Sequence, residues 1–407
     1  MNRQDSTTRF PKIAGATRFT DKAGVAAGIY IHIPFCLKKC PYCNFYSTTG
    51  LSLKDEFIKA LFKEIASHPR HSLSCDTIYF GGGTPSLLSP GEIFSVLDKL
   101  FQYFNIRQDA EITLEVNPGT IHYKNFRGYI DAGINRLNIG VQSFQDNHLK
   151  FLGRIHTARD ASEALKASGN AGFSNIGIDL IYGLSDQSIQ DWKKDLETAL
   201  SFHPEHLSCY MLAYERKTPF YKALKNGLLH PADEKLEGDF FSFTWEFLPE
   251  NGYIPYEISN FSRNDRTTER CYRSRHNQKY WHFAPYIGLG PSAHSYMDPI
   301  RYWNVESVDE YIRKIQATNC PVTAEETLTM EQQMIESIFL GFRTTDGIDL
   351  KRFEKKFGLT FYSLVLKPLQ NLTQEGYLIL SDTFCRLTPS GMRFHDSICD
   401  LLIGAMP

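Results

Sequence analysis

Short apolar runs separated by amphipathic stretches limit the folds open to this chain more than any other feature. Six such runs, each four to eight residues long, lie at residues 28–35, 77–80, 112–116, 136–141, 176–181 and 206–212. Runs of this length that are rich in Ile, Val, Leu or Tyr are typical of strands buried on both faces of a sheet. The stretches between them, such as 54–66 and 91–104, place apolar residues three and four positions apart, as helices do.

This alternation predicts βαβ units around a parallel sheet, and therefore an α/β fold. Six units fit either a partial (β/α)6 barrel or an open doubly wound sheet. From about residue 216 onward the pattern loosens. We expect four parts, which are a disordered lead-in at 1–24, the α/β unit at 25–260, a linker with further motifs at 261–325, and a smaller domain at 326–407.

The last part predicts a winged-helix-like α+β domain. It reads as three short helices, a strand pair at 377–380 and 384–387, and a final helix. Such domains often bind DNA, but from residue 322 onward there are 8 Lys and Arg against 11 Asp and Glu. A net charge of −3 opposes phosphate binding, so we expect a lid or docking domain and no nucleic-acid partner.

Composition excludes several classes of protein. The 407 residues carry a net charge of −2, which gives no general attraction to nucleic acid or acidic lipid. No apolar run approaches the roughly 20 residues of a membrane span, so we expect no transmembrane segment and leave a peripheral membrane association open. The nine cysteines are odd in number and six are scattered, which favours free thiols in a reducing cytoplasm.

Polar or glycine-rich segments follow the expected strands at their carboxyl ends. Turns explain the glycines and prolines there. They do not explain Glu115, Gln142 and Asp179, which lie inside or directly beside apolar runs. Because the carboxyl ends of parallel strands meet at one edge, where α/β proteins form their sites, we expect these side chains to share a site.

Three cysteines lie within eight residues, at Cys36, Cys40 and Cys43, in the pattern C-x3-C-x2-C. Three thiolates can hold a [4Fe-4S] cluster by three irons and leave the fourth open for S-adenosylmethionine (SAM). The rival is a zinc site completed by His32 or a distant cysteine. The glycine-rich turn at 81–85 favours the cluster, because it allows close backbone approach to the amino acid part of SAM.

The chain resembles radical-SAM proteins of the oxygen-independent coproporphyrinogen III oxidase group. The similarity runs from about Gly28 to Gly391 and is carried by segments 29–36, 81–85, 115–118, 140–144, 152–156 and 179–183. This resemblance implies a partial (β/α)6 radical-SAM barrel followed by a smaller C-terminal domain. It also implies [4Fe-4S] and SAM as cofactors.

The resemblance further implies which residues contact SAM. Tyr30 and Tyr42 would lie near the cluster and the ligand, and Glu115 would hydrogen-bond the ligand. The methionyl part would be held by three residues of the glycine-rich turn, Gly82, Gly83 and Thr84. Four residues match in type the positions that contact a second SAM in the porphyrinogen enzyme, namely Gln142, Arg154, Asp179 and Ala213. A remnant of that second pocket is therefore expected.

Two features are similar to the HemW-type haem chaperone subgroup. Phe45 stands where the true coproporphyrinogen enzymes carry a further cysteine, and residues 276–281 read His-Asn-Gln-Lys-Tyr-Trp, like the H-N-x-x-Y-W pattern of the chaperones. The resemblance implies a protein that binds haem and passes it to an acceptor protein of respiration. The alternatives are oxygen-independent coproporphyrinogen III dehydrogenase activity and radical chemistry on another tetrapyrrole. An electron donor is required only if SAM is cleaved.

His276 is the expected axial ligand of haem. Tyr280 and Trp281 offer flat faces for a porphyrin, and Cys271 is a further candidate ligand. Nearby arginines could pair with the propionates, at positions 263, 266, 270, 273 and 275. The structural alternative is that the histidine and its neighbours pin a turn against the barrel.

Overall fold

The computed structural model describes residues 25–406 with the exception of 70, 72 and 265–270. The lead-in expected at 1–24 therefore lies outside the described residues. Six strands form the parallel centre of the main sheet, as the apolar runs predict. They are β1 (Ala27–Ile33), β2 (Ser74–Gly82), β3 (Asn105–Val116), β4 (Arg136–Gln142), β5 (Ile176–Tyr182) and β6 (His206–Met211).

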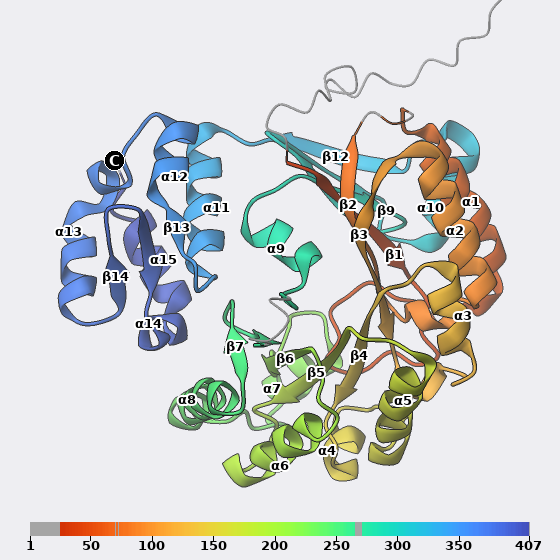
Figure 1. The fold of residues 1–407 in the computed structure, drawn as a ribbon, viewed down its shortest axis with the longest axis horizontal. Helices are drawn as coiled ribbons and strands as arrows, with labels where there is room; N and C mark the ends of the chain where they lie inside the picture. The colour runs from red at the N-terminus through yellow and green to blue at the C-terminus, as the bar shows by residue number, and fades with distance from the viewer. Residues whose placement is uncertain (1–24, 70, 72, 265–270, 407) are drawn as a thin grey trace, which may run out of the picture.

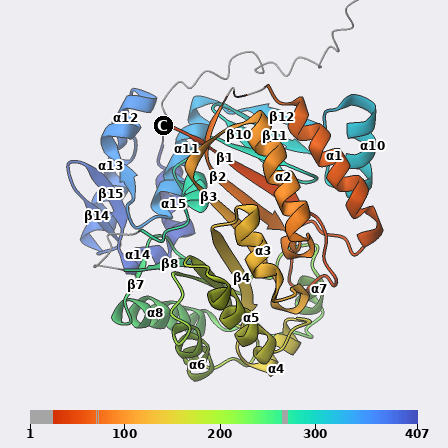
Figure 2. The ribbon, with the colours of Figure 1, turned by 45° about the vertical axis from the view of Figure 1, so that its right-hand side comes forward.

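The connecting helices lie mainly along one face of these strands (Figure 1, Figure 2). They are α1 (Lys54–Ser67), α2 (Pro90–Tyr103), α3 (Asn125–Ala132), α4 (Asp146–Phe151), α5 (Ala158–Ala171) and α6 (Ile189–Leu200). Capping boxes that begin at Ser89, Thr157 and Ser188 satisfy the first backbone N–H groups of α2, α5 and α6. One large apolar core lies between these helices and the sheet. The expected α/β fold class is confirmed.

The sheet continues beyond both edges of this parallel centre. Beside β6 lie β8 (Asn260–Arg263) and β7 (Tyr253–Pro255), which follow α7 (Pro219–Lys225) and α8 (Glu234–Glu250). Beside β1 lies β9 (Tyr286–Leu289), parallel to it, followed by the antiparallel strands β10 (His294–Met297), β11 (Ile300–Asn304) and β12 (Val322–Thr327). Helix α10 (Val308–Thr318) packs against α1.

Residues 261–325 were expected to form a linker, and the structure corrects this. They supply four strands to one edge of the main sheet. The sequence gives little sign of these strands because each has only four to six residues and none forms a long apolar run or a regular alternation of polar and apolar residues. The backbones of two of these strands also approach each other closely at Gly288. A Cβ there would lie 2.1 Å from the carbonyl oxygen of His294, so the position requires glycine.

The C-terminal domain has a core of its own. Its elements are α11 (Met330–Phe342), β13 (Ile348–Asp349), α12 (Leu350–Phe357), α13 (Phe361–Gln374), β14 (Leu378–Leu380), β15 (Phe384–Leu387), α14 (Pro389–Arg393) and α15 (His395–Ile403). The strands pair in the order β13-β15-β14, which agrees with the expected winged-helix-like arrangement. In Figure 1 the short helix α9 (Arg275–Trp281) lies between this domain and the parallel strands. None of the described helices is long and apolar enough to cross a membrane.

A buried carboxyl group joins the first helix to the added strands. Glu64 of α1 is 3% exposed and accepts hydrogen bonds from the Gly290 N–H at 2.8 Å, Asn304 Nδ2 at 2.7 Å and the Tyr311 hydroxyl at 2.6 Å. Burial raises the pKa of Glu64 to about 7. The folded chain therefore keeps this proton at pH values where the unfolded chain has released it, so stability falls as pH rises through that window.

Replacing Glu64 should remove this pH dependence. We expect the free energy of unfolding of the wild type, relative to Glu64→Gln, to fall by about 3 kcal/mol as the pH rises from about 5 to about 8. Urea unfolding followed by circular dichroism at a series of pH values measures the difference. Glu56→Gln, which changes an exposed carboxylate on the same helix, should keep the wild-type profile. Parallel profiles for wild type and Glu64→Gln would contradict the prediction.

Candidate functional site

A cavity of about 570 Å³ opens at the carboxyl ends of the parallel strands. Its wall contains Cys43 and most of the side chains that the sequence predicts for SAM, namely Tyr42, Gly82, Gly83, Thr84, Glu115, Gln142, Arg154, Asp179 and Ala213. Residues from six different strand ends meet here because the strands are parallel and in register. The volume lies within the range typical of small-molecule sites.

The cysteine loop follows β1 and closes on itself at the cavity edge. The N–H of Cys36 donates to the carbonyl of Thr48 at 3.0 Å, and the N–H of Cys43 donates to the carbonyl of Cys40 at 3.1 Å. The carbonyl of Pro41 accepts from the Phe220 N–H at 3.0 Å, which ties the loop to α7. All three cysteines are free and partly exposed. The loop therefore presents three thiols beside the cavity.

The surroundings of these thiols suit an iron–sulfur cluster. Arg154 Nη1 donates to Cys40 Sγ at 3.7 Å, and the Thr84 hydroxyl donates to Cys36 Sγ at 3.4 Å. Burial raises the pKa of the Cys43 thiol, and the neighbouring charges of Cys40 and Cys36 add to this effect. Three thiolates so placed need a cationic group to hold them together, and a [4Fe-4S] cluster is such a group.

The zinc alternative finds less support in the same geometry. Within the described ranges, no three His, Cys, Asp or Glu side chains converge on one ion position. Both ring nitrogens of His32 are also engaged, by the Tyr30 hydroxyl at 3.1 Å and by the carbonyl of Tyr46 at 2.9 Å. His32 therefore holds the far end of the cysteine loop and has no free nitrogen for a metal.

The glycine-rich turn lies directly against the cysteine loop. Gly82 has a φ of +110°, and the N–H of Gly83 donates to the carbonyl of Ile33 at 2.8 Å. A Cβ on Gly83 would lie 2.6 Å from the carbonyl oxygen of Phe35, closer than any side chain allows. Glycine at these positions brings Thr84 within reach of Cys36.

Two half-buried carboxyl groups, Glu115 and Asp179, line the cavity. Glu115 accepts from the Tyr79 hydroxyl at 2.8 Å, and Asp179 accepts from Asn138 Nδ2 at 2.6 Å. Burial raises the pKa of Glu115 to about 7 and raises the pKa of Asp179 as well. A ligand with a sulfonium or an ammonium group would stabilise their charged forms.

The four residues expected to form a remnant of a second pocket line the same cavity, and that pocket stays a prediction. Arg154 Nη2 donates to the carbonyl of Gly140 at 2.8 Å, and Gln142 has a φ of +70° at the end of β4. Among the described residues, Arg154 Nε and Asp179 Oδ1 are buried without a hydrogen-bond partner. Such orphaned atoms fit a site whose polar ligand completes their hydrogen bonds.

Tyr30 does not line the cavity. It lies one layer behind the glycine-rich turn, where a Cβ on Gly81 would come within 2.9 Å of its ring. Strand alternation explains this, since the Tyr30 hydroxyl reaches His32 on the same face of β1. Tyr42 does line the cavity, with its ring 6.3 Å from that of Phe220.

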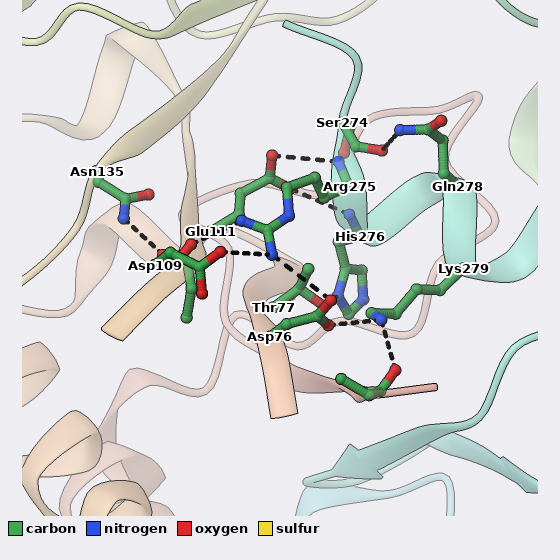
Figure 3. Close-up of polar contacts among 12 residues, drawn as sticks. Asp76, Thr77, Asp109, Glu111, Asn135, Ser274, Arg275, His276, Gln278 and Lys279 are labelled. Atoms are coloured by element: carbon green, nitrogen blue, oxygen red, sulfur yellow. Dashed lines mark hydrogen bonds and ion pairs between the residues drawn. The ribbon is translucent and has the colours of Figure 1, made fainter. Parts of the chain in front are cut away.

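Figure 3 shows the His276 ring next to Thr77 of β2, and His276 is not among the residues that line the cavity. It is 1% exposed, its Nδ1 shares a hydrogen bond with the Thr77 hydroxyl at 2.8 Å, and its Nε2 shares one with the Tyr280 hydroxyl at 3.0 Å. Burial lowers its pKa to about 3, so the ring is neutral. Both nitrogens of His276 therefore already have partners, and its expected role as axial haem ligand stays a prediction. The structural alternative, a histidine that pins α9, fits the geometry.

The nearby arginines also have partners already. Arg263 pairs with Glu205 at 2.9 Å, Arg273 with Asp346 at 2.8 Å, and Arg275 with Asp76 at 3.5 Å. Arg266 and Arg270 lie outside the described residues. Cys271 is exposed and free.

The sequence pattern did not identify several residues that line the cavity or lie near it. Asn138 interrupts an apolar run as Glu115 does, so the same signal could have identified it. Tyr79 looks like an ordinary core residue in sequence, but its hydroxyl holds Glu115. Asn277 of α9 also lines the cavity, and its place inside the His-Asn-Gln-Lys-Tyr-Trp motif was the available signal. Arg136 is fully buried nearby, and nothing in the sequence marked it as interior.

Comparison with known proteins agrees with this geometry. Residues 30–199 match the model of the radical SAM superfamily, and residues 328–394 match the HemN C-terminal domain. The solved structure of coproporphyrinogen III oxidase (HemN) from Escherichia coli aligns with a TM-score of 0.80 over 93% of this chain and 90% of that chain. At 23% identity this likeness establishes the fold.

Full-length relatives are more similar in sequence. The heme chaperone HemW of Synechocystis sp. is 35% identical over 93% of this chain and 96% of its own length. The HemW proteins of Bacillus subtilis and Escherichia coli are 33% and 32% identical, over 93% and 92% of this chain and 99% and 97% of their own lengths. The chain therefore belongs to the HemW family of radical-SAM proteins.

Proposed function

We propose that this protein is a haem chaperone that binds haem, carries a SAM-ligated [4Fe-4S] cluster and transfers haem to an acceptor protein. The observation that carries the proposal is identity of 31–35% over more than nine-tenths of the chain to several relatives named heme chaperone HemW. The cavity supports the cofactor part of the proposal, because its donors and orphaned polar atoms fit a cluster and an amino acid ligand.

In this proposal each part of the site has a separate task. Cys36, Cys40 and Cys43 would hold the cluster at the edge of the cavity in which SAM would lie. The glycine-rich turn holds the methionyl part against the cysteine loop. Glu115 and Asp179 balance the positive charge of the ligand, while Arg154 stabilises the Cys40 thiolate. When bound, the cluster supplies single electrons to SAM.

The alternative is oxygen-independent coproporphyrinogen III dehydrogenase activity. Phe45 argues against it, because the enzymes of the related group carry a cysteine at that position. Phe45 lines the cavity and is 67% exposed, so its ring is not part of the core. We therefore place haem binding first.

We also propose that the protein works in the cytoplasm with a haem acceptor and, where SAM is cleaved, an electron donor. Nine free cysteines and a labile cluster fit the reducing cytoplasm. The acceptor is a haem-requiring protein of respiration, which a peripheral membrane association would bring within reach. A one-electron donor is required only where SAM is cleaved. The C-terminal domain, with its net negative charge, serves as a docking element.

Removing one cluster ligand should abolish the cluster. We expect anaerobically reconstituted protein to hold about four irons and four sulfides, and Cys43→Ala to lose most of both. Iron and sulfide analysis with the absorbance near the cluster bands measures this. Cys320→Ala, a free cysteine far from the loop in sequence, is the matched control and should keep the full content. Colourless wild-type protein that carries zinc would contradict the cofactor assignment.

Replacing Glu115 should weaken SAM binding. Glu115→Gln removes a negative charge from the cavity wall, and we expect about tenfold weaker binding of SAM to the reconstituted protein. Anaerobic equilibrium dialysis measures the affinity, and Glu306→Gln, an exposed change elsewhere, should leave it unchanged. Equal affinity in wild type and Glu115→Gln would remove Glu115 from the ligand set.

An assay with both candidate substrates separates the two functions. We expect the reconstituted protein to bind ferric haem in a titration, and to form no protoporphyrinogen IX from coproporphyrinogen III when SAM and a reductant are present. Product analysis by chromatography, together with a search for 5′-deoxyadenosine, provides the measurement. Protoporphyrinogen formation with consumption of SAM would favour the dehydrogenase over the chaperone.

A further inference from the structure

Helix α9 separates the SAM cavity from a second cavity. Asn277, near its beginning, lines the first cavity, whereas Trp281 at its end and His282 line the second. The second cavity has a volume of about 460 Å³ and is closed on its other side by α11, β13 and α12 of the C-terminal domain. In Figure 1, α9 occupies the space between that domain and the barrel strands.

The wall of this second cavity is rich in aromatic rings. The guanidinium of Arg343 lies 4.4 Å from the centre of the Trp281 ring, and the ammonium of Lys356 lies 4.5 Å from the centre of the Phe283 ring. Trp281 Nε1 is buried and lacks a hydrogen-bond partner among the described residues. Phe353 and Phe357 complete the apolar surface. A flat apolar ligand matches such a wall.

The charges around this cavity favour an anion. Its two acidic residues are engaged, since Asp346 pairs with Arg273 at 2.8 Å and Asp349 accepts from the backbone N–H of Arg352 at 2.9 Å. The Arg352 side chain, in contrast, has no salt bridge or hydrogen bond within the described part of the chain. Lys356, which lies over the Phe283 ring, has a carboxylate contact of 3.9 Å to Asp298, too long for a close ion pair. Two cations thus remain available for carboxylates.

The cavity also holds an imidazole that could bind iron. His282 is exposed, and its ring nitrogens make no hydrogen bond to any described residue. This contrasts with His276, whose two nitrogens are both engaged inside the barrel. A neutral histidine with a free nitrogen is the usual axial ligand of haem iron.

We propose that the cleft between α9 and the C-terminal domain is the haem site, with His282 as the axial ligand and with Arg352 and Lys356 pairing with the propionates. Trp281 and the phenylalanines would cover the porphyrin faces. The inference rests on the proposed function, which supplies the ligand class, and it adds the location and the contact residues. It also places haem and SAM at opposite ends of one helix.

Titration of full-length reconstituted protein with ferric haem tests the ligand. His282→Ala should lose the absorption bands of histidine-ligated haem, and added imidazole should restore them. His294→Ala is the matched control, because it removes another exposed histidine that lines a different cavity. Wild-type bands in His282→Ala would overturn the axial assignment. Their loss in His294→Ala alone would place haem in that other cavity.

Removal of two positive charges from α12 tests the propionate contacts. The double variant Arg352→Gln and Lys356→Gln should weaken haem binding about tenfold or more. Lys351→Gln with Lys355→Gln makes the same charge change on exposed positions of α12 outside the cavity, and should keep wild-type affinity. Equal affinities of the two double variants would remove the cations from the site.

If several groups share the binding energy, a single loss of contact has little effect. A bulky side chain placed in the cavity then tests the location of the haem site. Ser337 of α11 lines the cavity, so Ser337→Trp should fill it and abolish haem binding while leaving the cluster intact. Wild-type affinity in Ser337→Trp would overturn the location but leave the chaperone function standing. Failure of the wild-type protein to bind haem at all would remove both proposals together.

Discussion

The close contact between the glycine-rich turn and the cysteine loop is the constraint on which the site depends. Gly83 touches the backbone at Ile33 and Phe35, and a single added methyl group would push turn and loop apart. Gly82 leaves room for the ring of His32, which holds the end of the cysteine loop through the carbonyl of Tyr46. Because one backbone contact sets both positions, the three cysteines and the glycine-rich turn are fixed relative to each other.

Buried charge is the second property that shapes the cavity. Arg136 is fully buried and Glu115 and Asp179 are half-buried in the cavity wall, and desolvation disfavours the charged form of both carboxyls. Such groups are costly for the empty fold, since their hydrogen bonds are incomplete. A cationic ligand recovers part of that cost when it binds. The same groups therefore lower stability without ligand and favour a cationic ligand over a neutral one.

Much of this site could be predicted because parallel strands bring their carboxyl ends to one edge. Glu115, Gln142 and Asp179 come from three strands, yet all line one cavity, as their positions in apolar runs indicated. Periodicity does not tell how a histidine is surrounded, so it could not separate buried His276 from exposed His282 six residues later. The strands between 286 and 327 were missed for a related reason, since segments of four to six residues without a regular pattern resemble loops until their neighbours are known.

The position of helix α9 suggests a role for the motif at 276–281 even though both ring nitrogens of His276 already have partners. At seven residues it is too short to be stable alone, and it is held by Glu111, which accepts from the N–H groups of Arg275 and His276, and by Thr77. Its position is therefore set by β2 and β3, the strands that also carry the glycine-rich turn and Glu115. Because its far end lines the cleft under the C-terminal domain, any ligand that moved α9 from one cavity would change binding in the other. Linkage makes that coupling equal in both directions.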